Sequence, residues 1–494
     1  MPLILPGNVA TATASTAYSI DNSCRFNDGD SVGMSRTMGT PTDADKWTFS
    51  CWIKRGFITD ASTMVFYAFV SGNEAGVHLY QSNGVGEQLR FKNVVSSATE
   101  GELLTNRQLR DVAAWYHIVY VYDSGNATAG NRMRIYVNGV EETSFVTDSN
   151  PDQDQDSAVN SAIKHCIGSY NDASNFFDGY IAECVFCDGQ AYAASDFGEF
   201  DEDSPTIWKP KDPSGLTFGN NGFWLDFEDS SALGNDVSGN NNDFGQTNLA
   251  AADQCQDSPT NNFVTLNPLN VPTSNPPVFS EGNTSSVTSS SGTSNFGGVT
   301  TIGLTKGKWY VEAKAVMGGT TRNDIGLVAN QETIIDSNRL AQGHNTYEWS
   351  WEVGTPAWRY ETDSGAVQTQ TLSTYANGDI IALYLDLDNH KLYAAKNGTI
   401  QNSGTGLSIP TAASTPLGLY YFVGADSTST SVTAQWDWNF GNGSYAGTAV
   451  SSAVADANGY GKFEYDPSDG GSSSFDSTAK NFYAICTKNL AEFG

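Results

Sequence analysis

The chain has 494 residues, of which 39% are hydrophobic and 12% aromatic, enough apolar material to bury the cores of two large domains. It carries 25 Lys and Arg against 55 Asp and Glu, and this net charge of −30 argues against nucleic acid or an anionic membrane surface as a partner. No apolar stretch approaches the length of a membrane span, so we expect no membrane insertion.

The first 22 residues have no strand pattern of their own. They begin MPLILPGNVATATAS, without a basic region and with Pro2 and Pro6 in a short apolar run. We therefore expect neither a secretory signal nor a membrane anchor. Residues 1–22 are interpreted as an N-terminal arm that could dock into a partner protein.

Strand patterns dominate residues 23–200. WTFSCWIKR (47–55) has one apolar and one mixed face, whereas WYHIVYVYD (115–123) is apolar on both faces, as in a central strand. MRIYVNG (133–139) ends in an Asn-Gly pair that favours a tight hairpin, and DGYIAECVFCDG (178–189) is a further strand between turns. Short strands separated by turns predict a β-sandwich domain here.

Residues 201–295 interrupt this pattern. They are rich in Pro, Asp and Asn and show little periodicity, so we interpret them as an extended connector ordered by packing against its neighbours. The end of the connector, SSVTSSSGTSN (285–295), has low complexity and is expected to be mobile or exposed.

Strand patterns return in residues 296–445. KWYVEAKAV (308–316) alternates, and NGDIIALYLDLDNHKLYAAKNGT (377–399) contains two strands joined by a short turn and followed by a second Asn-Gly corner. These features predict a second sandwich, with residues 446–494 as a C-terminal tail packed on a domain. The predicted fold class is therefore all-β, with two antiparallel β-sandwich domains joined by an extended connector.

The seven cysteines are scattered and odd in number, which favours free thiols over a disulfide framework. Cys184 and Cys187 form a lone C-x-x-C, but in a strand their side chains would face opposite sides of the sheet, which disfavours a zinc site. His117 lies within a strand and is expected to be a packed residue rather than a base.

Carboxylates cluster at Glu199, Asp201 and Asp203, with Glu202 beside them. Alternation would place the first three on one face, and a retaining glycosidase needs two carboxylates about 5 Å apart. The segment lacks flanking apolar alternation, so a solvated acidic loop is the favoured interpretation. We therefore predict no catalytic residues and expect that the protein is not an enzyme.

The stretch YEWSWEVGTPAWRY is unusually aromatic. Trp349 and Trp351 share one face of a strand and are expected in a core, because aromatic side chains are mostly buried. Trp358, Arg359 and Tyr360 follow a Gly-Thr-Pro segment that suggests a nearby loop. These three residues are our candidates for binding a ligand at the surface.

Two acidic stretches could supply oxygen ligands for calcium. NDGDS contains Asp28 and Asp30, and DVSGNNND contains Asp236 and Asp243. Asp and Asn in tight turns explain the same residues without a metal, and that interpretation is favoured. We predict no cofactor and keep calcium as the alternative.

Two parts of the chain resemble known families. CRFNDGDSVGMSRT, WTFSCWIKR, AWYHIVYVYDS, RIYVNGV and FFDGYIAECVFCDG, within residues 23–200, resemble in their order the laminin-G or concanavalin A-like lectin/glucanase superfamily. GKWYVEAKA, DIGLVAN, NGDIIALYLDLDNHKLYAAKNG and WNFGN, within residues 300–442, resemble a SPRY domain. Both resemblances imply concanavalin-like, jelly-roll sandwiches.

The combination of the two domains with DQCQDSPTNNFVTLNPL and YAICTKNL resembles virion proteins of marine tailed bacteriophages. It implies a structural virion protein assembled in the host cytoplasm, a tail-fibre-like appendage that contacts host-surface glycans or other virion proteins, as a homo-oligomer. A capsid decoration or head-fibre protein, anchored by residues 1–22, is the alternative. A glycan depolymerase acting through Asp201 is a third, weaker alternative.

Overall fold

The computed structural model describes residues 18–494 except 57, 59–61, 83–84, 273–275, 289–295, 318–322, 331–346, 354–355, 362–366, 427–433 and 469–479. The regular secondary structure of the described chain is almost entirely β-strand in antiparallel sheets, which confirms the predicted all-β fold class. Its residues up to Asn262 form one compact unit, the N-terminal unit, and those from Phe263 form another, the C-terminal unit.

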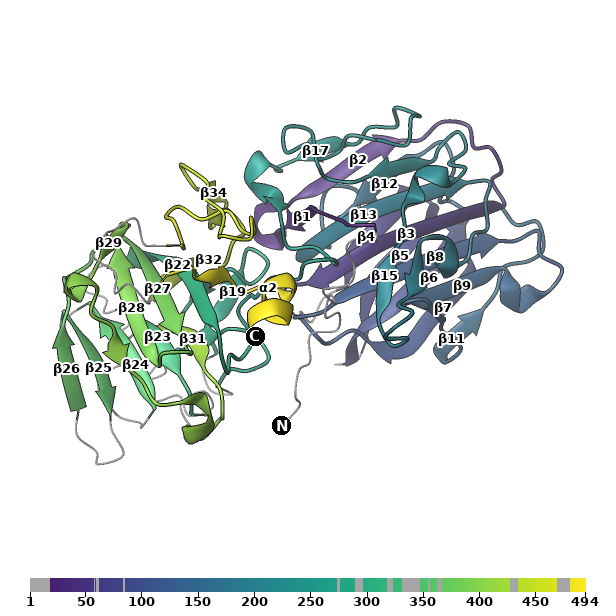
Figure 1. The fold of residues 1–494 in the computed structure, drawn as a ribbon. Coiled ribbons are helices and arrows are strands. Elements are labelled where there is room, and N and C mark those ends of the chain that lie inside the picture. The colour runs from purple at the N-terminus through teal and green to yellow at the C-terminus, as the bar shows by residue number, and fades with distance from the viewer. Residues whose placement is uncertain are drawn as a thin grey trace. The chain divides into compact units, whose positions relative to one another are not determined.

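The N-terminal unit contains two large sheets (Figure 1). The β3 sheet comprises β1 (Ser23–Phe26), β3 (Lys46–Arg55), β8 (Trp115–Asp123), β9 (Met133–Val137), β10 (Val140–Glu141), β13 (Gly179–Asp188), β16 (Phe223–Leu225) and β18 (Gln254–Cys255), in the order β10-β9-β8-β3-β13-β1-β18 with β16 paired to β13. The β5 sheet comprises β2 (Gly33–Thr37), β4 (Thr63–Val70), β5 (Asn73–Ser82), β6 (Val85–Val95), β7 (Ala98–Gln108), β11 (Phe145–Ser149), β12 (Lys164–Ile167) and β17 (Gly245–Thr247), in the order β11-β7-β6-β5-β4-β12-β2-β17.

Alternation in β3 gives each face of its sheet a different environment. Trp47, Phe49, Cys51 and Ile53 lie in the core that the two sheets share, and the Phe49 ring stacks on Phe66 of β4 with centroids 4.6 Å apart. The intervening residues face the other side of the β3 sheet. Alternating side chains thus place the main core between the sheets, as the sequence pattern of β3 predicts.

The other face of the β3 sheet is also buried. Trp52 and Trp115 from the sheet pack there with Phe197, Trp208 and Phe218, which come from later in the chain. Trp208 belongs to a small ribbon formed by β14 (Gly198–Phe200) and β15 (Trp208–Pro210). This apolar layer closes that face of the sheet against solvent.

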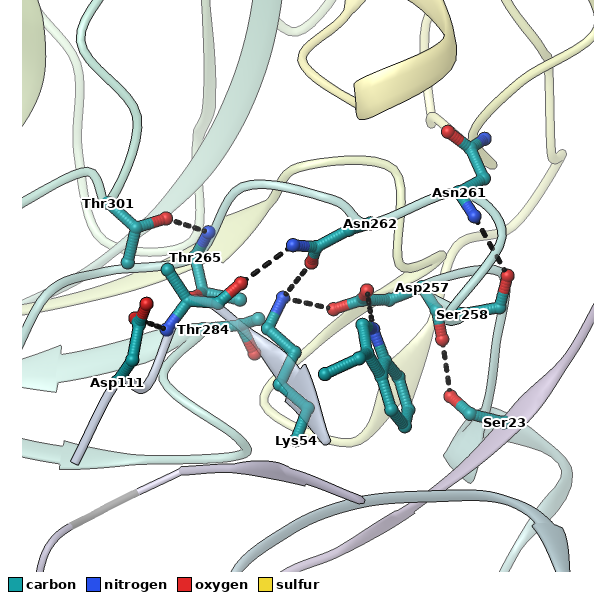
Figure 2. A network of polar contacts seen from close by, with 12 residues as sticks. Ser23, Lys54, Asp111, Asp257, Ser258, Asn261, Asn262, Thr265, Thr284 and Thr301 are labelled. Atoms are coloured by element: carbon teal, nitrogen blue, oxygen red, sulfur yellow. Dashed lines mark hydrogen bonds and ion pairs between the residues drawn. The ribbon is translucent and has the colours of Figure 1, made fainter. Parts of the chain in front are cut away.

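A buried ion pair fixes the end of this layer to the sheet (Figure 2). The ammonium of Lys54 lies 2.7 Å from a carboxylate oxygen of Asp257 and 2.7 Å from the amide oxygen of Asn262. The indole of Trp115 donates to the second Asp257 oxygen, and Asn262 donates to the Ala113 carbonyl. Strands β3 and β8 therefore hold the last residues of the unit through charge-assisted hydrogen bonds.

The predicted connector, residues 201–295, is divided between the two units rather than lying between them. Strands β16 and β18 pair with β13 and β1 in the N-terminal unit. In the C-terminal unit, β19 (Val278–Ser280) and β20 (Ser285–Val287) extend a sheet. These strands have too few residues to show a periodic pattern, which is why the sequence of the segment predicts no regular structure.

The C-terminal unit is a second pair of sheets. The β22 sheet comprises β19, β20, β22 (Lys308–Met317), β27 (Ile380–Asp386), β28 (Lys391–Lys396), β29 (Thr399–Ile400), β30 (Leu407–Ser408), β32 (Ala434–Asn439) and β35 (Tyr483–Ala484). The β24 sheet comprises β21 (Phe296–Val299), β23 (Asn323–Val328), β24 (Glu348–Glu352), β25 (Ala357–Glu361), β26 (Val367–Thr371) and β31 (Tyr421–Asp426). Residues of both sheets form one core.

The two Asn-Gly corners form as predicted. Asn138 and Gly139 have φ angles of +48° and +79°, and Asn397 and Gly398 have +47° and +74°. Positive φ at both central residues is what a tight hairpin requires, because it matches the turn to the twist of the strands. Each unit therefore uses its Asn-Gly pair to close one ribbon of its own sheet.

The low-complexity stretch is in part buried, which corrects our expectation that it is exposed. Ser285 and Ser286 are both 1% exposed, and the Ser285 hydroxyl donates to Asp437 at 2.7 Å. The backbone of β20 pairs with β32, so these serines belong to a strand rather than to a loop. Residues 289–295 lie outside the described residues.

The tail is tied to the C-terminal unit by a buried carboxylate. Glu312 of β22 accepts from the hydroxyls of Tyr310 and Tyr445, at 2.6 and 2.7 Å, and from the backbone amides of Glu464 and Tyr465. Strand β33 (Ser444–Tyr445) lies just before the predicted tail and pairs with β34 (Thr448–Ala449) inside it, and the tail also contains the helix α2 (Thr487–Phe493). Among the described residues, no helix has the length and apolar character needed to cross a membrane.

All seven cysteines lie among the described residues, buried and outside any disulfide bond. Cys184 faces the core between the sheets and Cys187 the apolar layer on the opposite face, as expected for a strand. Between Ala182 and Val185, β13 carries a bulge, and Glu183 within this bulge has a φ of +48°. Its carboxyl group accepts from the Tyr18 hydroxyl at 2.9 Å, and burial together with Asp226 raises the pKa of Glu183 to about 8.

The buried ion pair leads to a stability prediction. Lys54→Met removes the cation that neutralises Asp257, so we expect it to lower the free energy of unfolding of the N-terminal unit by about 3–5 kcal/mol. Lys46→Met is the matched control on the same strand, because Lys46 lies 3.8 Å from Asp123 in a more exposed pair and should cost less than about 1 kcal/mol. Denaturant unfolding measures both, and equal losses would contradict the assignment.

The raised pKa of Glu183 predicts a pH dependence. The unfolded side chain loses its proton near 4.5 and the folded one near 8, so the unfolded state binds fewer protons in between and stability falls as pH rises. The slope is at most about 1.4 kcal/mol per pH unit. Between about pH 5 and 8.5, the unfolding free energy of wild type should fall relative to that of Glu183→Gln as pH rises. A constant difference would show that Glu183 is not the titrating group.

Candidate functional site

The aromatic site predicted in β25 is not a single surface patch. Trp358 is 2% exposed and packs in the core against Trp351, with ring centroids 6.3 Å apart. This corrects the expectation that Trp358 lies at the surface. Strand β25 pairs antiparallel with β24, and the register places Trp358 directly opposite Trp351.

Alternation separates the other two candidates. Tyr360 lies on the same side of β25 as Trp358 and packs, half-buried, against the core. Arg359 points to the opposite side of the sheet, where the register pairs it with Ser350 and Thr369. The three residues therefore do not converge, and ligand binding by Arg359 or Tyr360 stays a prediction.

The candidate calcium ligands take part in turns. Asp236 accepts from the backbone amides of Trp224, Ser238 and Asn242, and Asp243 accepts from the Asp236 amide at 2.9 Å. Asp28 and Asp30 form an exposed 3₁₀ turn in which Asp30 accepts from the Asn27 amide group. Across the described ranges, no three His, Cys, Asp or Glu side chains gather as a metal site would require.

The acidic segment Glu199–Asp203 faces lysines rather than a second catalytic carboxylate. Lys209 of β15 lies 3.3 Å from Glu199 and 3.7 Å from Asp201. Asp201 also accepts from the backbone amides of Asp203 and Ser204, as in a turn. This arrangement agrees with a solvated acidic loop on the β14–β15 ribbon.

A buried Ser-His pair looks at first like a nucleophile and its base. The Ser50 hydroxyl lies 2.8 Å from Nε2 of His117, but the Trp208 indole donates to Nδ1 at 3.0 Å. Nδ1 is therefore the acceptor, and Nε2 carries the proton and donates to Ser50. His117 is therefore a packed residue, as predicted, and its burial lowers its pKa to about 3. It cannot take a proton from Ser50.

The β5 sheet presents a different kind of face away from the core. Its outward side chains form what we term the aromatic strip: Phe69 and Tyr67 of β4, His78 and Tyr80 of β5, Arg90 of β6, and Tyr170 from the turn after β12. Phe69, Tyr80, Arg90 and Tyr170 are only partly buried. In contrast to the β3 sheet, whose second face lies under the apolar layer, this face keeps aromatic rings in reach of solvent.

Ring contacts connect the strip from one strand to the next. Tyr170 lies 5.0 Å from Phe69 and 5.2 Å from Tyr67 between centroids, and His78 lies 6.0 Å from Tyr67 and 5.8 Å from Tyr80. The Arg90 guanidinium then sits 4.4 Å from the Tyr80 centroid, a cation–π distance. The rings are thereby held in fixed positions before any ligand binds.

His78 supplies a neutral polar group within the strip. It is 3% exposed, and burial, followed by Arg90 and Lys92, lowers its pKa to about 3. Its Nδ1 has no hydrogen-bond partner among the described residues. A buried polar atom without a partner is costly, so an internal water molecule is the natural partner of this nitrogen.

The aromatic strip is not among the sites predicted from the sequence, although β5 carries a signal for it. In NEAGVHLYQS, Ala75, Val77 and Leu79 enter the core while Glu74, His78 and Tyr80 alternate with them. Such a pattern predicts a strand with one polar-aromatic face. It does not reveal whether that face is covered.

Comparison with known proteins agrees with this fold. The model of the Concanavalin A-like lectin/glucanases superfamily, Laminin_G_3, matches residues 27–191, about a third of the chain. A search of curated proteins finds no match.

Several solved structures are similar to parts of this chain or to most of its length. The SPRY domain of human HERC1 is 17% identical, with a TM-score of 0.25, over 31% of this chain and 87% of that one. A heptameric SAP-like pentraxin from Limulus polyphemus is 15% identical, with a TM-score of 0.27, over 36% and 80%. Mouse laminin alpha1 domains LG4-5 are 10% identical, with a TM-score of 0.28, over 98% and 92%. It is the family match that identifies a concanavalin A-like, laminin G-like domain, within residues 27–191.

Proposed function

We propose that this protein is a non-enzymatic adhesion protein that binds glycans on the aromatic strip of its N-terminal unit. The observation that carries the proposal is the strip itself, a row of partly exposed rings with polar groups beside them on one sheet face. The match of residues 27–191 to the Concanavalin A-like lectin/glucanases superfamily supports an interaction with glycans.

The chemistry of the strip suits a sugar. The C–H groups on one side of a sugar ring pack on the face of an aromatic ring, while its hydroxyls need nearby donors and acceptors. Tyr80 and Tyr170 provide partly exposed rings, and Arg90, Glu102 and Glu74 provide donors and acceptors around them. The rings need little ordering on binding because their neighbours already hold them.

Two arrangements support binding over catalysis. The Ser50–His117 pair is buried with its proton on the wrong nitrogen for a base, and Glu199 and Asp201 are bridged by Lys209. Neither pair offers an acid and a nucleophile to a bound glycan.

We further propose that the protein acts as a tail-fibre-like appendage of a bacteriophage virion, assembled in the host cytoplasm as a homo-oligomer beside other virion proteins. The sequence resemblance of the domain pair supports this role, and adhesion to host-surface glycans would be its task. Antibody labelling of particles by electron microscopy tests the location. Label confined to the head would contradict a tail fibre.

Binding of glycans should depend on two rings. We expect Tyr80→Ala and Tyr170→Ala each to weaken binding on a glycan array and in calorimetry about tenfold or more, as buried aromatic contacts at binding sites do. Phe200→Ala is the control, because Phe200 is an aromatic residue 42% exposed on the β14–β15 ribbon. If the wild-type chain binds no glycan, or all three variants bind like wild type with intact melting curves, the proposed site is wrong.

A further inference from the structure

We infer that the aromatic strip selects electrically neutral glycans and discriminates against sulfated or carboxylated ones. This inference rests on the proposed function, since it names the class of glycan that the same face would take. It follows from how the charges on this face are arranged.

Each cation along this face has a carboxylate partner on the same face. Arg90 donates from Nε to Glu102 at 2.8 Å, Lys92 lies 3.6 Å from Glu74, and Lys164 pairs with Asp172. Three positive and three negative groups therefore cancel pair by pair. An anionic sugar would find no uncompensated cation among these residues.

Arg90 is held from two sides. Its guanidinium lies 4.4 Å from the Tyr80 centroid and is ion-paired with Glu102, and both side chains of that pair are only 17% exposed. Moving Arg90 onto a sulfate or carboxylate would break both contacts and leave Glu102 without its cation. An ion pair that is largely shielded from solvent resists such exchange more than an exposed one.

The centre of the strip adds no charge. His78 lies between the rings of Tyr67 and Tyr80, and its burial keeps the imidazole neutral at physiological pH. Its Nδ1 is buried as well, so the imidazole presents neither a charge nor an exposed polar atom to a ligand. The net charge of −30 on the whole chain adds repulsion toward any anionic ligand.

The test compares matched neutral and anionic probes on the full-length protein. We would measure binding of neutral hexasaccharides of glucose, galactose and mannose, and of the sulfated form of each, between about 0.05 and 0.5 M salt. The neutral form should bind about tenfold or more tightly than its sulfated form. Its affinity should change less than about twofold with salt, since no counterions are displaced from an unpaired cation.

Freeing the cations should reverse the selectivity. Glu74→Gln/Glu102→Gln leaves Lys92 and Arg90 without their carboxylates, so the sulfated probe should gain about tenfold in affinity, and this gain should vanish at high salt. Glu199→Gln removes the same kind of charge from the β14–β15 ribbon, away from the strip, and should leave the ratio unchanged. The wild-type comparison stands even if the double variant fails to fold.

The outcomes separate the two claims. Tighter, salt-dependent binding of sulfated probes by the wild-type chain would overturn neutral selectivity while leaving glycan binding intact. Absence of binding to every probe would overturn the proposed function itself, and with it this inference. A neutral preference that only Glu74→Gln/Glu102→Gln relaxes would support both.

Discussion

The buried Lys54–Asp257 ion pair is the constraint on which the N-terminal unit depends. It ties the last residues of the unit to the middle of the β3 sheet, 203 positions apart in sequence. Two charges removed from water are tolerated here because Asn262 and Trp115 complete their hydrogen bonds. Trp208, Phe218 and their neighbours cover the outer face of the same sheet, so a second apolar face is hidden from solvent.

The consequence for function is an asymmetry between two sheets of one sandwich. Both sheets share a core, but the β3 sheet is buried on both sides whereas the β5 sheet turns partly exposed aromatic side chains outward. Rings that are locked by their neighbours and flanked by paired charges form a surface that is rigid, weakly charged and rich in hydrogen-bonding groups. Those properties suit a ligand that is amphipathic rather than ionic, and a sugar has that character.

Much of the fold could be predicted from alternation and turn chemistry. The pattern in 47–55 places Trp47 inside and Trp52 on the opposite face, and both Asn-Gly pairs adopt the positive φ angles that the hairpins need. The features that could not be predicted from the sequence also have physical causes. Strands of two or three residues in 201–295 pair with distant partners and are too short to show a periodic pattern. Strand β25 lies beside β24 over the core, which buries Trp358. Which face of the β5 sheet remains open depends on residues far along the chain, so local sequence could not identify the strip.

The most direct test of glycan binding on the aromatic strip is hydroxyl-radical footprinting of the full-length protein with and without a bound oligosaccharide, read out residue by residue by mass spectrometry. The account predicts that Tyr80, Tyr170 and Phe69 become protected while Phe200 on the β14–β15 ribbon keeps its labelling. Protection of Arg359 and Tyr360 in the C-terminal unit, with Tyr80 and Tyr170 unchanged, would contradict it.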